Sequence, residues 1–279
     1  MFPFRTSLNA STLFPFRLSV PEQVRVAAEA GYDGIELWVK DIEAELDAGR
    51  TVSSLRRDID AAGVNVVNAI AFFAWADADP AVRDRAFAQA RREMETLAAL
   101  GCAAVAAPPF GDVEGVPLEA FAERFAALVE LGRSFGVEPL LEFWGRAKRL
   151  SKVGEALFVA AESGVPDAKL LLDPFHMYTG GSALSSLRYV KGENIGIVHA
   201  NDYPSAPGRS AIADKDRVFP GEGIAPSAEL ARLLYAAGYR GYLSLELFID
   251  DFAGKSASDV AAHGLACMKR AYAVEVERT

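Results

Sequence analysis

Four apolar runs in the second half of the sequence each lead to a side chain that can bind a divalent metal ion. The runs have the length and composition of buried β-strands, and their end residues are Glu142, Asp173, His199 and Glu246. Three carboxylates and one imidazole form an oxygen-rich ligand set, which suits Mn²⁺, Mg²⁺, Co²⁺ or Zn²⁺ better than an ion that prefers thiolates. Because each residue belongs to a different strand, the pattern predicts one site where parallel strands end together.

A repeating order of helix, glycine and strand surrounds these residues. Gly31 lies shortly before the β-rich run 35–38, and Gly238 lies shortly before the run 242–247. Glycine ends a helix at low energetic cost because it readily adopts the left-handed conformation. Strands that alternate with helices in this way form a parallel sheet with right-handed crossovers.

The number of repeats predicts a closed barrel. Periodic apolar residues and capping signals predict helices over residues 21–30, 53–62, 79–100, 117–135, 151–162, 183–190, 227–237 and 256–272. With a first strand over residues 4–8, the sequence contains eight predicted strands and eight predicted helices. We therefore expect residues 1–279 to form one domain, a single (β/α)8 TIM barrel. The alternative is a doubly wound open sheet, but the first strand is not followed by the glycine-rich turn of that fold.

The barrel supplies the geometry that the four ligands need. Chemistry in such barrels takes place at the C-terminal ends of the strands, and strands five to eight are neighbours. Glu142 and Glu246 lie in apolar surroundings, where a carboxylate is costly unless it is paired, metal-bound or protonated. A salt bridge to a neighbouring strand is the structural alternative for Glu142. Asp173 precedes Pro174, so it could also simply form a turn.

Further polar and aromatic residues at strand ends complete the predicted pocket. His176 follows Asp173 by about one helical turn, and we expect it to contact substrate or to support the metal ligands. Glu36 and Asn68 are expected to bind substrate from the opposite wall, although Glu36 could instead be a structural carboxylate paired within the barrel. Trp144 could cover an apolar face of a polyol. His263 lies in the middle of a predicted helix and is interpreted as structural.

Composition restricts the class of protein. Apolar residues make up 51% of the chain and charged residues 24%, so a large core can form. The net charge of −9 disfavours binding to a nucleic-acid backbone. Cys102 and Cys267 lack a C-x-x-C spacing and are expected to be buried free thiols. The first 20 residues contain no apolar stretch that resembles a signal peptide or a membrane span, so a cytoplasmic protein is expected.

These residues resemble the sugar isomerase and epimerase branch of the xylose-isomerase-like barrels. The resemblance covers nearly the whole chain, and its more specific parts are Asp173-x-x-His176 and the stretch Arg217-x-x-Pro220-Gly221-Glu222-Gly223. It implies one divalent ion bound by Glu142, Asp173, His199 and Glu246. It also implies that Arg217 and His176 face the substrate and that the two glutamates transfer protons.

The predicted reaction is an isomerisation or epimerisation of a keto-polyol or ketose, such as an inosose or a sugar. A divalent ion would polarise the carbonyl, and a carboxylate would remove the neighbouring proton to give an enediolate. Loss of a hydroxyl from the same enediolate would make the protein a dehydratase of an inosose or a dehydroshikimate-like substrate. A catalytically silent sugar-binding barrel is the alternative from another class. The sequence leaves open the oligomeric state, including a homo-oligomer.

One loop departs from the expected pattern. Residues 145–149, after the fifth strand, contain Arg146, Lys148 and Arg149, which is more basic than a pocket for a neutral polyol requires. A solvated loop is the favoured interpretation. The alternative is a phosphorylated or otherwise anionic sugar held by these cations.

Overall fold

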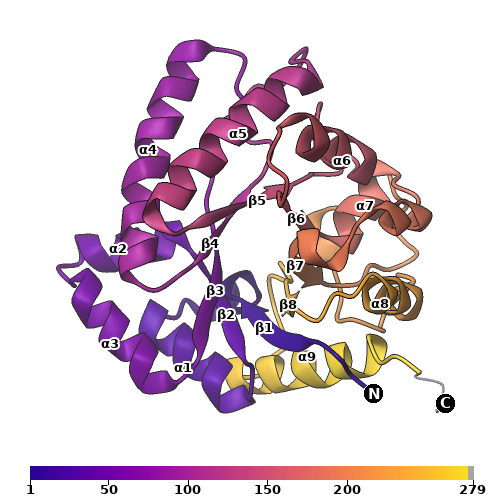
Figure 1. Cartoon of the computed structure of the whole chain (residues 1–279). Coiled ribbons are helices and arrows are strands. Elements are labelled where there is room, and N and C mark those ends of the chain that lie inside the picture. Colours follow the sequence, from indigo (N-terminus) through magenta and orange to yellow (C-terminus); the bar gives the residue numbers. More distant parts are fainter. Residues whose placement is uncertain (276–279) are drawn as a thin grey trace.

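The computed structural model describes residues 1–275, in which a ring of helices surrounds a closed parallel barrel (Figure 1). The strands follow one another around the barrel in chain order, and β1 closes it by pairing with β8. They are β1 (Arg5–Asn9), β2 (Gly34–Trp38), β3 (Asn65–Ile70), β4 (Ala104–Ala107), β5 (Glu138–Glu142), β6 (Lys169–Leu172), β7 (Ile195–Ala200) and β8 (Tyr242–Leu245). The predicted (β/α)8 TIM barrel is therefore confirmed.

The α-helices form the outer layer. They are α1 (Val20–Ala30), α2 (Val39–Asp47), α3 (Val52–Ala62), α4 (Pro80–Ala99), α5 (Leu118–Phe135), α6 (Val153–Glu162), α7 (Pro174–Gly180), α8 (Ser227–Ala236) and α9 (Ala257–Ala271). Short 3-10 segments lie at η1 (Ala10–Phe16), η2 (Leu184–Tyr189), η3 (Gly192–Asn194) and η4 (Asp214–Asp216). The order of elements places each strand end next to a loop or helix that can carry site residues.

Local sequence signals explain where the helices begin and end. Ser19 and Glu22 form a capping box at the start of α1, with the Ser19 amide 2.8 Å from a Glu22 carboxylate oxygen. Gly31 ends α1 in the left-handed conformation with φ of 87°, as the sequence predicted. Ser256 and Asp259 form a second capping box at the start of α9. These caps satisfy backbone groups that a helix end would otherwise leave unpaired.

Alternating side chains along the strands divide the core into two regions. The larger region packs the outer face of the sheet against the helices. The smaller one gathers residues from successive strands and includes Ile70, Ala106, Leu140, Leu171 and Ile197. Since successive side chains of a strand point to opposite faces, this second group fills the barrel interior and forms the base on which the site rests.

Two helical predictions differ from the structure. The predicted helix over 183–190 is wrong, because that segment contains only the 3-10 segment η2, and α7 follows β6 directly. The sequence analysis took Asp173-Pro174 as a turn candidate, whereas Asp173 is the N-cap of α7 and accepts a hydrogen bond from the Phe175 amide at 2.7 Å. Helix α2, which follows β2 without a break, was not predicted.

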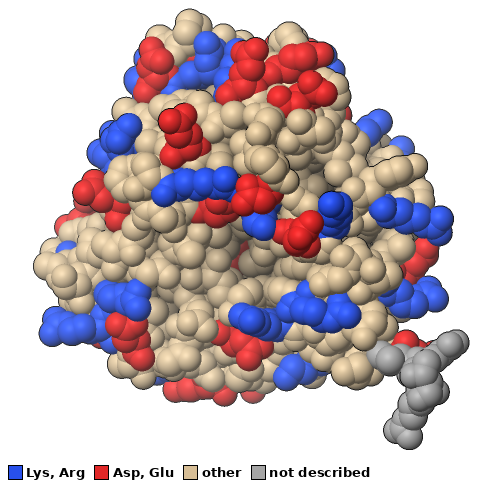
Figure 2. All heavy atoms as spheres, in the orientation of Figure 1, with Lys and Arg blue, Asp and Glu red and all other residues tan. Residues whose placement is uncertain are grey.

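The surface carries both signs of charge. On the face in Figure 2, Lys and Arg side chains are interspersed with Asp and Glu, and neither sign forms a continuous field. Among the described residues, no helix combines the length and apolar character that a membrane crossing requires. Both cysteines are free and buried, as predicted.

Candidate metal and substrate site

Three of the four predicted metal ligands converge at the C-terminal ends of adjacent strands. Asp173 follows β6, His199 lies in β7 and Glu246 follows β8. One ligand atom from each lies within 4.8 Å of the others. The side chains are almost completely buried, so they meet in a region where water does not screen their charges. This convergence follows from the barrel geometry that the sequence predicted.

The imidazole of His199 is oriented toward the two carboxylates. Its Nδ1 atom lies 3.0 Å from Glu246 Oε2 and 3.5 Å from Asp173 Oδ2, but it has no hydrogen-bond partner of acceptable geometry. Its Nε2 atom lies 3.3 Å from a Glu36 oxygen. A carboxylate at Nε2 favours a proton on that nitrogen, so Nδ1 is the nitrogen that faces the two carboxylates as a metal ligand would. A divalent cation bound there would take the place of a second proton on the imidazole.

The buried charges perturb one another strongly. Burial alone would lower the pKa of His199, but Glu246 and Glu36 raise it well above its ordinary value. Burial would raise the pKa of Asp173, but the Arg217 guanidinium and His176 hold it well below its usual range. The Asp173 carboxylate therefore remains negative at neutral pH and requires positive partners in the same small volume.

Arg217 supplies one such partner. Its Nη1 donates hydrogen bonds to Asp173 Oδ2 at 2.9 Å and Glu246 Oε2 at 2.6 Å, the oxygens that also face His199 Nδ1. The guanidinium carbon lies 4.5 Å from the ring centre of Phe175 and 5.1 Å from that of Phe248. Arg217 is almost completely buried yet borders the pocket, so its position agrees with a role toward substrate.

The loop that carries Arg217 is organised by Asp202. This buried carboxylate accepts hydrogen bonds from the backbone amides of Gly221, Gly223 and Ala225 at 2.7–3.1 Å. A Cβ atom on Gly223 would lie 2.4 Å from Asp202 Oδ1, so glycine is required there by close approach. These contacts show that Asp202 caps the loop.

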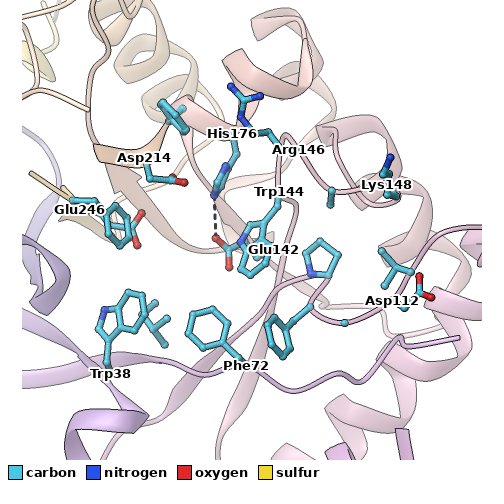
Figure 3. A pocket seen from close by; sticks show the side chains of 18 of the residues that line it. Trp38, Phe72, Asp112, Glu142, Trp144, Arg146, Lys148, His176, Asp214 and Glu246 are labelled. Carbon is cyan, nitrogen blue, oxygen red and sulfur yellow. Dashed lines mark ion pairs between the residues drawn. The ribbon is translucent and has the colours of Figure 1, made fainter. Parts of the chain in front are cut away.

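Glu142 lies apart from the three converging ligands and faces His176. Their closest atoms, Glu142 Oε1 and His176 Nε2, are 3.9 Å apart (Figure 3). Burial raises the pKa of Glu142 to about 8, with Glu246 and Asp173 adding to the shift. Burial lowers the pKa of His176. Glu142 therefore carries a proton at neutral pH in this arrangement, and its predicted role as a metal ligand remains a prediction.

The pocket above these residues has a volume of about 730 Å³. Figure 3 shows Trp38 and Phe72 across the cavity from His176, with Glu142 between them. Aromatic rings form most of its apolar lining: Trp38, Phe72, Phe110, Trp144, Phe175 and Phe248. Such a pocket offers apolar surface to the C–H faces of a ring or chain, with acids and an imidazole at its base. Trp144 lies where the sequence predicted it.

Glu36 and Asn68 occupy a different position from the one predicted. Both are fully buried, neither borders the pocket, and Asn68 Nδ2 donates to Glu36 Oε2 at 2.6 Å. Since Glu36 faces His199, these residues support the imidazole from behind. This arrangement favours the structural alternative considered for Glu36 over direct contact with substrate.

The basic loop after β5 is mainly an anchor. Arg146 donates hydrogen bonds to backbone carbonyls of Arg209 and Ser210 at 3.2 Å and also to Ile212. Arg149 donates to a backbone carbonyl of Val116 at 3.1 Å. These contacts tie the loop to neighbouring segments, while Arg146 and Lys148 of the same loop also line the pocket.

Some contributing residues were not identified from the sequence. Asn201 Nδ2 donates to Asp173 Oδ1 at 3.1 Å, and the alternation of side chains in β7 could have revealed it because it lies two residues after His199. Asp214 contacts Arg217 at 2.5 Å and borders the pocket. No periodic signal marks Asp214, since it lies in the short 3-10 segment η4.

The fold and this site define the class of protein. The chain belongs to the xylose isomerase-like TIM barrel family, whose model matches residues 24–271.

The names of individual relatives indicate which activities occur in similar proteins. The chain is 29% identical over 237 residues to an inosose isomerase of Halalkalibacterium halodurans, covering 82% of this chain and 83% of that protein. It is 27% identical over 259 residues to a 3-dehydroshikimate dehydratase of Pseudomonas putida, covering 88% of this chain but 39% of that protein. A crystal structure of the IolI protein with a bound zinc atom superposes with a TM-score of 0.88 at 22% identity, covering 96% of this chain and 98% of the other, and shows the shared fold.

Proposed function

We propose that this protein is a divalent-metal-dependent isomerase or epimerase of a keto-polyol or ketose. The observation that carries the proposal is the convergence of Asp173, His199 and Glu246 at the base of a pocket that also exposes Glu142 and His176. The similarity to an inosose isomerase, which covers 82% of this chain and 83% of that protein, supports the same conclusion.

Asp173, His199 and Glu246 would hold the ion, with Glu142 as a predicted fourth ligand. The donor set of carboxylate oxygens and one imidazole nitrogen fits Mn²⁺, Mg²⁺, Co²⁺ or Zn²⁺. When bound, such an ion supplies Lewis-acid polarisation of a substrate carbonyl. Glu36 and Asn68 hold the His199 ring in the orientation that ligation through Nδ1 requires.

The two glutamates are suited to opposite directions of proton transfer. Glu246 is oriented by hydrogen bonds from Arg217 and Asn9 at 2.6 and 3.1 Å and borders the pocket, and we assign to it the removal of the proton beside the carbonyl. Glu142 has a raised pKa of about 8 and can return a proton. Return to the opposite face of the same carbon is epimerisation, and return to the neighbouring carbon is isomerisation.

Arg217 and His176 would stabilise the oxyanion that develops on the substrate. Arg217 is fixed by its carboxylate contacts and by the rings of Phe175 and Phe248, so little reorganisation is needed when charge appears. The aromatic lining offers apolar surface that would cover the apolar faces of the substrate. A neutral substrate agrees with the anchoring role of Arg146 and Arg149.

Proton exchange in D₂O tests the proposal. The metal-stripped protein, with Mn²⁺, Mg²⁺, Co²⁺ or Zn²⁺ added back, is incubated with a panel of inososes and ketoses, and incorporation of deuterium beside the carbonyl is followed by NMR. We expect metal-dependent exchange and a product of unchanged mass, apart from the deuterium. A lack of exchange with every metal and substrate would instead support a sugar-binding barrel.

A dehydratase is the second candidate, because the similarity to a 3-dehydroshikimate dehydratase spans most of this chain. Both reactions begin with removal of the same proton. Mass spectrometry separates them, since dehydration removes one water from the substrate and isomerisation does not. Dehydroshikimate therefore belongs in the substrate panel.

A further inference from the structure

A second group of metal-binding side chains lies on the outer layer of the barrel, between α9 and the loop that carries Arg217. Glu222, His263 and Cys267 each direct one ligand atom into a group whose members lie within 4.8 Å of one another. His263 and Cys267 are four residues apart on α9, so they lie on the same face of the helix. None of the three takes part in the site at the barrel mouth.

Hydrogen bonding alone leaves this group poorly satisfied. His263 Nε2 lies 2.9 Å from Glu222 Oε1 and 3.5 Å from Cys267 Sγ. A single imidazole nitrogen either donates one proton or accepts one, so it cannot serve both neighbours well. The third distance, from Cys267 Sγ to Glu222 Oε1, is 3.8 Å and is long for a bond to a carboxylate.

The same distances are close to those of a tetrahedral zinc site. Zinc bonds of about 2.3 Å to sulfur and about 2.0–2.1 Å to nitrogen and oxygen give ligand separations of roughly 3.3–3.6 Å at tetrahedral angles. The two separations that involve Cys267 Sγ are 3.5 and 3.8 Å. Only Glu222 would need to move, by about half an ångström from His263, and it is an exposed side chain.

One cation contacts the Cys267 sulfur, and the site is open to an ion. Burial raises the pKa of this thiol, and the Arg270 contact opposes that shift. Arg270 Nη2 donates to Cys267 Sγ at 3.3 Å, the kind of contact that orients and stabilises a ligating sulfur. Cys267 is buried, whereas the side chains of Glu222 and His263 are 41% and 39% exposed, so an ion can reach the sulfur past them. A solvent molecule can take the remaining position.

We propose that Glu222, His263 and Cys267 form a second, structural site for Zn²⁺ that joins the Arg217 loop to α9. Phe219 of this loop already packs edge-on against the His263 ring, with ring centres 4.6 Å apart. A bound ion would add a direct link between the two segments. Asp202 already holds the same loop by accepting hydrogen bonds from the amides of Gly221 and Gly223. A zinc ion would add a second point of attachment and so limit movement of the segment that positions Arg217.

Cobalt spectroscopy distinguishes this site from the one in the barrel. The metal-stripped protein is titrated with Co²⁺, and the near-ultraviolet absorption is followed for thiolate-to-cobalt charge transfer. The barrel ligands contain no sulfur, so we expect the band to arise only from Cys267. It should persist in Cys102→Ala and in Glu246→Gln, and it should be absent from Cys267→Ala.

Zinc stoichiometry gives an independent measurement. After equilibrium dialysis against Zn²⁺, Cys267→Ala should retain one zinc fewer per chain than the unaltered protein, and His263→Ala should bind that zinc at least about tenfold more weakly. If Cys267→Ala does not fold, as judged by circular dichroism, Cys267→Ser replaces it because its hydroxyl cannot produce the thiolate band. Absence of the band in the unaltered protein, or its persistence in the folded Cys267 variant, would overturn the proposal.

Discussion

Replacing Arg217 with methionine tests how the buried charges of the site are balanced. The substitution keeps much of the side-chain volume but removes hydrogen bonds to Asp173 and Glu246, both buried. Two charge-assisted bonds at about 1.5–3 kcal/mol each give a loss of roughly 3–6 kcal/mol. Loss of one partner from a buried ion pair typically costs about 3–5 kcal/mol, which is consistent with that range. Asp214 is half-exposed and adds less than about 1 kcal/mol.

Urea unfolding in the presence of a chelator measures this loss as a shift of the midpoint at unchanged slope. With saturating Mn²⁺ the loss should become smaller, because a divalent cation near the same two oxygens offsets their repulsion. Arg133→Met is the matched control: its carboxylate partners Glu138 and Asp167 are more exposed to solvent, so the midpoint should shift far less. A metal-free Arg217→Met protein as stable as that control would refute the assignment of Arg217 as the counter-charge of the site.

Three further predictions address catalysis and stability. Glu142→Gln and Glu246→Gln should each lower kcat by at least about 100-fold in the D₂O exchange assay, because each removes a proton-transfer group, and near-normal turnover of either would disprove its assigned role. Asp202→Ala should lower the free energy of unfolding by about 2–4 kcal/mol and reduce kcat, because it frees the backbone of the Arg217 loop. Asp202→Asn should keep part of the stability and part of the activity. Equal behaviour of the two variants would argue against a hydrogen-bonding role. Burial on α4 raises the pKa of Glu93 to about 7 from 4.5, so the folded state binds its proton more tightly and stability falls as pH rises through this interval. After allowance for solvent screening, Glu93→Gln should therefore be more stable than the unaltered protein by ~1–2 kcal/mol near pH 8, with the difference vanishing near pH 4; a pH-independent difference in thermal melts would contradict the shift.

The barrel was predictable because its signals are local and repeated. Strand β8 was predicted over residues 242–247 and is observed at Tyr242–Leu245, since Gly238 and the apolar run that follows it mark its start. Helix α7 was missed because it has only seven residues and begins immediately after Asp173, where proline also favours a turn. The 3-10 segment η2 was taken for an α-helix because its apolar spacing does not distinguish the two geometries.

The site was predictable to the extent that strand order determines it. Asp173, His199 and Glu246 meet because their strands are neighbours in a closed barrel. The separation of Glu142 from this group depends on its contact with His176, which strand order does not specify. The position of Glu36 behind His199 depends on contacts across the barrel interior, and residue types alone do not reveal such contacts.

The positions of the tryptophans allow entry of a molecule into the cavity to be followed by fluorescence. Trp38 and Trp144 border the cavity, whereas Trp75 is fully buried against Phe121 and Phe125. Intrinsic fluorescence should therefore contain two emitters that respond to a molecule entering the cavity and one that provides a constant background. A Trp75→Phe protein would sharpen that signal, so that candidate substrates could be screened by titration before any turnover assay exists.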